Sequence, residues 1–114
     1  MHMTAAEEGE CLVISVDENR IDASVAVRFK DQMREMTNRN PKRVVLDLSQ
    51  VEFVDSSGLG AVVGAMKQLG RDRRLDLAGL TPAVDKVFRM TRMDTVFRLF
   101  PDRASAVGGV AHAS

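Results

Sequence analysis

The chain has little of several residue types on which common functions depend. It holds one cysteine, Cys11, so no internal disulfide can form, and this cysteine lies in an apolar run that predicts a buried, unreactive thiol. Its two histidines, His2 and His112, lie in the terminal segments, which leaves almost nothing for a zinc site or a histidine-based catalytic triad. Tryptophan and tyrosine are absent, so few aromatic rings are available to stack on nucleic-acid bases.

The chain also lacks an excess of charge and a long apolar run. Its 16 Lys+Arg and 16 Asp+Glu give a net charge of zero, which argues against a dedicated DNA- or RNA-binding protein. No run approaches the roughly 18 apolar residues that span a bilayer, and no secretory signal precedes the first strand. We therefore expect a cytoplasmic protein that binds neither nucleic acid nor a membrane and holds no metal or cofactor.

The length and the apolar content favour one folded domain. A chain of 114 residues that is 45% apolar can bury a core without disulfides or metals. We expect a flexible N-terminus over residues 1–9, the domain over residues 10–101, and a loose C-terminal tail over residues 102–114, where the composition turns small and polar.

Hydrophobic periodicity predicts alternating strands and helices. Strands are expected at residues 10–16, 20–21, 43–49, 75–80 and 96–100. Helices are expected after Asp22, from Leu59 to Gly70, and after Thr81, with Asp22 and Thr81 as N-caps. This order predicts a small α/β domain, a mixed and mostly parallel sheet of four to five strands joined by α-helical crossovers.

The segment Asp55–Gly60 stands out because polar and flexible residues join a buried strand to the start of a helix. Each glycine there costs about 1 kcal/mol relative to alanine. In a structural interpretation, Ser56 or Ser57 caps the helix and the glycines allow a tight turn. In a functional interpretation, the helix N-terminus is an anion site at which a serine hydroxyl carries or contacts a phosphate.

Two enzymatic interpretations of the same segment fit poorly. Gly58, Gly60 and Gly64 are similar to a dinucleotide-binding loop, but the strands are too few and the glycines begin beyond the end of the strong strand. A serine hydrolase needs a glycine two residues before its nucleophile and a histidine base, but Val54 and Asp55 stand at the glycine position and no internal histidine exists. We therefore predict that the chain is not an enzyme.

The segments 45–49 and 51–60 together resemble the signature of bacterial anti-sigma factor antagonists, in the STAS domain family. The segment Arg20–Ala23 is similar to an early loop of that family, residues 75–80 to the following strand, and residues 84–93 to its third helix and exit. The resemblance covers residues 10–100. In the early loop, the family's usual glycine is Asn19 here, and Arg20 replaces a frequent glutamate.

The resemblance implies a single STAS-type domain that acts in a partner switch. The unphosphorylated antagonist binds a GHKL-type serine kinase that otherwise sequesters a sigma factor. The kinase inactivates the antagonist by phosphorylating it, and a PP2C-type phosphatase restores it. Carried onto this chain, the phosphoacceptor is Ser56. The partner-binding residues are expected to be Asp22, Asp55, Ser57, Gly58, Leu59, Gly60, Val63 and Lys67.

An alternative from a different class stays open. A STAS domain that is not phosphorylated can serve as a regulatory or structural subunit of a transporter or a stress complex. The two hypotheses differ in whether Ser56 is modified.

Overall fold

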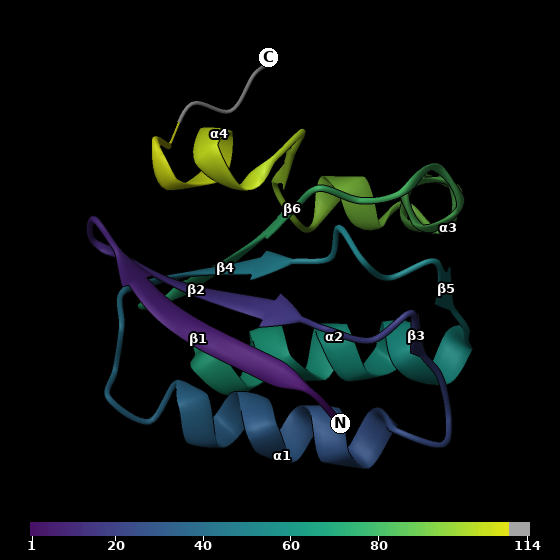
Figure 1. Cartoon of the computed structure of the whole chain (residues 1–114), viewed down its shortest axis with the longest axis horizontal. Coiled ribbons are helices and arrows are strands. Elements are labelled where there is room, and N and C mark those ends of the chain that lie inside the picture. Colours follow the sequence, from purple (N-terminus) through teal and green to yellow (C-terminus); the bar gives the residue numbers. More distant parts are fainter. Residues whose placement is uncertain (110–114) are drawn as a thin grey trace.

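The central sheet is built from the most apolar segments of the chain. The structure, a computed structural model, describes residues 1–109. β2 (Cys11–Val16), β4 (Arg43–Asp47), β6 (Arg74–Ala78) and β7 (Leu99–Phe100) run parallel, and β1 (Met3–Glu8) pairs antiparallel with β2. The order β1-β2-β4-β6-β7 places β4 in the middle (Figure 1). The predicted α/β fold with a mostly parallel sheet is confirmed.

One face of the sheet carries the main core. Side chains alternate between the two faces of a strand, and Ile14, Leu46 and Leu77 are fully buried on the same side. α1 (Ala26–Met36) and α2 (Ser56–Leu69) cover this face and pack against each other (Figure 1). Gly70 ends α2 with a φ of 83°, a left-handed conformation that glycine adopts at low cost.

A smaller core lies on the opposite face, under α4 (Arg103–Val107) (Figure 1). It consists of Cys11, Val13, Val45, Ala78, Phe100 and Ala106. The prediction of a loose tail from residue 102 is therefore wrong for residues 102–109, because Asp102 caps a short helix and Ala106 is buried. Residues 110–114, the rest of the predicted tail, lie outside the described residues.

The prediction of a flexible N-terminus over residues 1–9 is also wrong. β1 pairs with β2 along its whole length, through a hairpin that turns at Gly9, where φ is 62°. Only Met3 of this strand is buried, so the pairing depends on backbone hydrogen bonds. At its end, the Glu8 carboxylate forms an ion pair with Arg103 of α4.

Several further elements differ from their predicted bounds, among them α2, which begins at Ser56 and not at Leu59. α1 begins at Ala26, and Asp22 does not cap it, because a turn closed by the Val25 N–H and the Asp22 carbonyl oxygen comes first. The last strand is shorter than predicted, because a 3₁₀ turn, η1 (Met93–Thr95), precedes it.

The third helix begins where the sequence predicts. α3 (Pro82–Met90) has Thr81 at its N-cap position, but the Thr81 hydroxyl donates to the Val51 carbonyl oxygen instead of capping the helix. Phe88 of this helix meets Phe97 edge to face, with ring centroids 6.1 Å apart. Across residues 1–109, no helix is long and apolar enough to cross a membrane.

Candidate functional site

A second, two-stranded sheet positions the segment that the sequence singles out. β3 (Arg20–Ile21) runs parallel to β5 (Phe53–Val54), with Arg20 opposite Phe53 and Ile21 opposite Val54. This pairing places the loop of residues 22–24 beside the start of α2. The early loop that is similar to the family's therefore lies beside the Asp55–Gly60 segment.

Asp55 joins the two parts of this site. One carboxylate oxygen, Oδ1, accepts a hydrogen bond from the Gly58 N–H at 2.8 Å and so caps α2. The other oxygen, Oδ2, accepts from the Ala23 N–H at 3.2 Å. The interpretation in which Ser56 or Ser57 caps the helix is wrong, because Asp55 takes this role and leaves both hydroxyls available.

Gly58 brings the helix into backbone contact with β3. A Cβ atom on Gly58 would lie 1.9 Å from the Ile21 carbonyl oxygen, a distance that no side chain tolerates. Gly60 differs, because no heavy atom lies within 4 Å of the Cβ it lacks. The close approach therefore requires a glycine at position 58 but not at position 60.

Ser56 and Ser57 are exposed at the first two positions of α2. Within residues 1–109, neither hydroxyl has a hydrogen-bond partner, and the N–H groups of the two serines have no acceptor. The positive end of the helix dipole lies at the same place. Two exposed hydroxyls and two unpaired amide donors therefore lie together at the start of α2.

Four of the predicted residues share one helix face. Ser56, Gly60, Val63 and Lys67 follow one another at spacings of four, three and four, which places them in one row along α2. Val63 is half-buried and Lys67 is exposed, about 17 Å from Ser56 along the helix axis at 1.5 Å per residue. Leu59 lies off this row and packs against the core.

Asp22 lies at the neighbouring loop. Its Oδ1 accepts from the hydroxyl of Ser24 at 2.6 Å, and its Oδ2 accepts from Nε of Arg20 at 2.9 Å. The Ser24 hydrogen bond, and after it that of Arg20, lowers the pKa of the Asp22 carboxyl below its ordinary value. Asp22 is therefore an anion at neutral pH that orders this loop.

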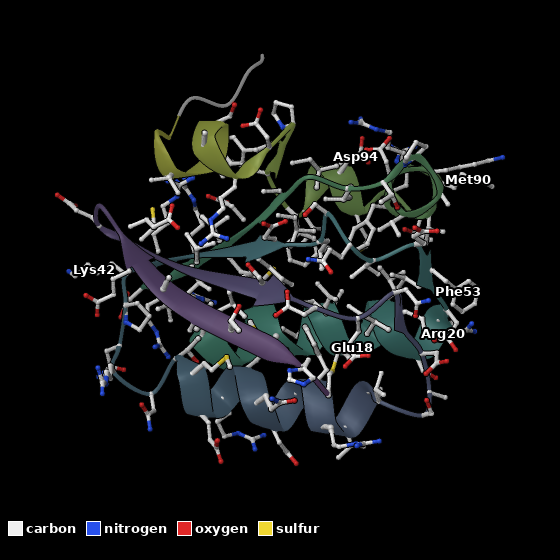
Figure 2. The ribbon with its side chains drawn as sticks, viewed as in Figure 1. Glu18, Arg20, Lys42, Phe53, Met90 and Asp94 are labelled. Atoms are coloured by element: carbon white, nitrogen blue, oxygen red, sulfur yellow. The ribbon has the colours of Figure 1, made fainter. Side chains whose placement is uncertain are left out.

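Two residues that were not predicted as part of the site lie beside it. The Arg20 guanidinium lies over the Phe53 ring, 4.6 Å from its centroid, and Phe53 is 44% exposed. Figure 2 shows Arg20 and Phe53 together at the end of the molecule where Met90 also projects. The sequence could have predicted that Phe53 is exposed, because neighbouring side chains of a strand point to opposite faces and Val54 points into the core.

Two other acidic strand residues, in β6 and β4, form contacts within the fold. Asp76, 1% exposed, forms ion pairs with Arg43 at 2.8 Å and Arg74 at 3.0 Å. Asp47 accepts from the Ser49 N–H at 3.0 Å and lies 3.7 Å from Arg103. Within the described part of the chain, no group of three or more histidine, cysteine or acidic side chains is placed to hold a metal ion.

Comparison with known proteins identifies the family. The family model for the STAS domain matches residues 2–106. The chain belongs to the STAS domain family. The match includes β1 and most of α4, the two elements that lie outside the domain bounds expected from the sequence.

Two curated relatives and one solved structure that are similar to this STAS domain are anti-sigma factor antagonists. It is 27% identical over 108 residues to the anti-sigma-F factor antagonist RsfB of Mycobacterium tuberculosis, covering 95% of this chain and 88% of the relative. It is 31% identical over 80 residues to the anti-sigma-B factor antagonist of Listeria monocytogenes, covering 69% of this chain and 70% of the relative. The crystal structure of an anti-sigma factor antagonist from Mycobacterium paratuberculosis superposes with a TM-score of 0.86 at 25% identity, covering 97% of this chain and 94% of the other.

Proposed function

We propose that this STAS domain is an anti-sigma factor antagonist that works by partner switching. In its unphosphorylated form it binds and sequesters an anti-sigma factor that is a GHKL-type serine kinase. Phosphorylation of Ser56 releases that kinase, and a PP2C-type phosphatase reverses the modification. The named relatives are antagonists, which supports this role and the prediction that the chain is not an enzyme. The proposed partners place the protein in the cytoplasm.

The observation that carries the proposal is the availability of Ser56. Its hydroxyl is exposed at the first position of α2, because Asp55 caps the helix in its place. In the transfer, a bond forms between Ser56 Oγ and the γ-phosphorus of ATP, ADP leaves, and the hydroxyl proton passes to a base on the kinase. In the reverse step, water cleaves that bond and inorganic phosphate leaves.

The charge of the phosphate is sufficient to end binding without a change of fold. A phosphate adds about −1.5 to −2 charges at a helix N-terminus, where the dipole favours it by about 0.3–1 kcal/mol. A hundredfold loss of affinity corresponds to about 2.7 kcal/mol. One repulsive charge pair 4 Å apart supplies about 4 kcal/mol at an effective dielectric constant of 20.

The proposed interface follows one face of the molecule. Ser57 and Gly60 lie beside the acceptor, Gly58 is buried beneath it against β3, and the row continues to Val63 and Lys67. Asp22 and Asp55 border it on the side of the 22–24 loop. The exposed Phe53 ring adds an apolar contact that the sequence did not predict as part of the interface.

The test is phosphosite mapping with a matched serine control. The protein is incubated with its cognate kinase and ATP, and modified residues are identified by mass spectrometry. We expect phosphate on Ser56 in the unsubstituted protein and in Ser57→Ala, and none in Ser56→Ala. Modification that persists in Ser56→Ala contradicts the assignment. A chain that the kinase binds to but never modifies supports the alternative role as an unphosphorylated subunit.

A phosphomimetic variant tests the mechanism separately. Ser56→Asp should lose kinase binding while its melting temperature, measured by circular dichroism, stays within a few degrees of the unsubstituted protein. A collapse of stability in Ser56→Asp refutes a mechanism that acts only at the interface.

A further inference from the structure

A broad basic groove lies at the end of α2 opposite Ser56. Its volume is about 980 Å³, and the last turn of α2, the start of β6 and the segment 94–99 enclose it. Six cationic side chains line it, those of Lys67, Arg71, Arg73, Arg74, Arg89 and Arg98. Its two acidic residues, Asp76 and Asp94, leave an excess of four positive charges in a chain whose net charge is zero.

Half of these cations already have partners. Arg73 donates to the carbonyl oxygens of Leu69 and Thr37, at 3.0 and 2.9 Å, and so ties the ends of α2 and α1 together. Arg74 pairs with Asp76. Arg89 pairs with Asp85 at 2.8 Å and with Asp94 at 3.7 Å.

The other three cations have no internal role. Lys67, Arg71 and Arg98 are exposed, and none forms an ion pair or a side-chain hydrogen bond with any residue from 1 to 109. The ion pairs inside the fold therefore do not use these three cations. Three uncompensated cations around one concave surface predict an anionic partner.

The same groove has apolar parts and an open strand edge. Val96 is 46% exposed, and Met66 and Leu99 are half-buried in the lining. β7 is the last strand of its sheet, and the carbonyl oxygens of Arg98 and Phe100 accept from β6 and the residue after it. The Leu99 carbonyl oxygen, which lies between them, points the other way, because successive carbonyl groups of a strand alternate.

These features favour an extended peptide over a compact anion. A small phosphate is best held by a helix N-terminus, whereas the groove lies at the C-terminal, negative end of α2. An extended acidic segment can reach the three spaced cations and place apolar side chains against Val96 and Leu99. We propose that the groove binds an extended acidic segment of a protein partner, along the outer edge of β7.

This second surface is remote from the phosphorylation site. Ser56 and Leu69 are 13 residues apart in one helix, which is about 20 Å at 1.5 Å per residue. A charge added at Ser56 is about two Debye lengths away at 0.1 M salt. The groove therefore keeps its affinity for its ligand when Ser56 is modified, although Lys67 borders both the groove and the proposed kinase interface.

The test uses fluorescence anisotropy with a labelled synthetic peptide in which Asp and Glu alternate with Val. The full chain should bind this peptide, more weakly as salt is raised, and should not bind a matched peptide with Ser and Gln in place of the acidic residues. The double variant Arg71→Glu with Arg98→Glu should bind about tenfold more weakly or worse. Arg71→Ala with Arg98→Ala removes the two charges without reversing them, and should also weaken binding, by less than the double glutamate variant does.

A second double variant separates the groove from net charge. Arg28→Glu with Arg39→Glu changes the charge by the same amount at exposed positions outside the groove, and should stay within about twofold of the unsubstituted protein. Equal losses in the two double variants overturn the proposal, as does absence of peptide binding. Binding to phosphatidylserine vesicles without peptide binding overturns it too. Ser56→Asp should retain peptide binding, and its loss contradicts an independent surface.

Discussion

At the scale of single residues, Gly58 is the most constrained position of the site. Replacing it with alanine places a methyl group against the Ile21 carbonyl oxygen and forces α2 away from β3. We expect Gly58→Ala to lower the free energy of unfolding by at least about 2 kcal/mol, measured by urea denaturation.

Gly60→Ala is the matched control for this substitution. The same change two residues along the helix enters open space and removes a glycine from a helix. It should raise the free energy of unfolding by up to about 1 kcal/mol. Equal effects at the two positions contradict the close approach at Gly58.

Asp55 provides a second residue-scale prediction. Asp55→Ala removes the acceptor for the N–H groups of Gly58 and Ala23, so we expect it to lower the free energy of unfolding by about 1–2 kcal/mol. Amide hydrogen exchange should speed up at both N–H groups. Asp55→Asn keeps a side-chain oxygen and should restore most of the protection at Gly58. If hydrogen exchange at the Ala23 N–H is unchanged in Asp55→Ala, then Asp55 does not hold the loop of residues 22–24 against the start of α2.

At the scale of elements, strong local patterns made good predictions. The continuous apolar run of β4 and the helical spacing of apolar residues in α2 are properties of adjacent residues, which sequence reasoning reads directly. The site segment was predictable for the same reason. The close approach at Gly58 and the hydrogen bond from Ala23 to Asp55 were not predictable, because they join residues more than 30 positions apart in the chain.

β1 and α4 were missed because tertiary contacts stabilise them. The segment from Met3 to Glu8 lacks apolar alternation and becomes a strand by pairing with β2. α4 has only five residues and is held by the Asp102 cap, by Ala106 in the small core and by Arg103. A helix of that length carries no periodic signal and is unstable alone.

Removal of α4 tests its contribution to the fold. Truncation after Pro101 should expose the small core around Cys11 and lower the free energy of unfolding by about 2 kcal/mol or more. The buried thiol of Cys11 should then react faster with a disulfide reagent such as DTNB. Truncation after Gly109 keeps α4 and is the control. If both truncated proteins match the full chain, α4 does not protect this face.

At the scale of the whole molecule, the zero net charge is a balance between two unlike halves. Residues 1–59 hold 7 basic and 11 acidic side chains, and residues 60–114 hold 9 and 5, so the halves carry −4 and +4. In the main sheet, β1, β2 and β4 come from the acidic half of the chain and β6 and β7 from the basic half. The proposed acceptor lies close to the boundary between the two halves along the chain.

The pH dependence of stability follows from two carboxylates. Hydrogen bonds from Ser24 to Asp22, and from the Ser105 N–H to Asp102, hold the pKa of each acid below its ordinary value. Such groups stabilise the fold above the pKa of the unfolded chain, and this contribution is lost as pH falls through the lower folded-state pKa. The melting temperature should therefore be nearly constant from about pH 8 to 5 and fall below about pH 4. Asp102→Asn, which preserves the cap, should show a smaller decrease in that acidic range.

The pairing of β3 with β5 has a consequence for the order of events in folding. The helix end that carries Ser56 is completed by residues 20–23, and the hydrogen bond from Ala23 to Asp55 spans 32 positions of the chain. Closing such a loop costs chain entropy, and an isolated helix of the length of α2 is marginal in water, so residues 55–69 alone do not form this helix end. A chain that is still being synthesised, or that is unfolded, therefore contains the Asp-Ser-Ser-Gly sequence without the conformation that it has in the folded protein. Any partner that recognises this helix end thereby distinguishes finished molecules from incomplete ones.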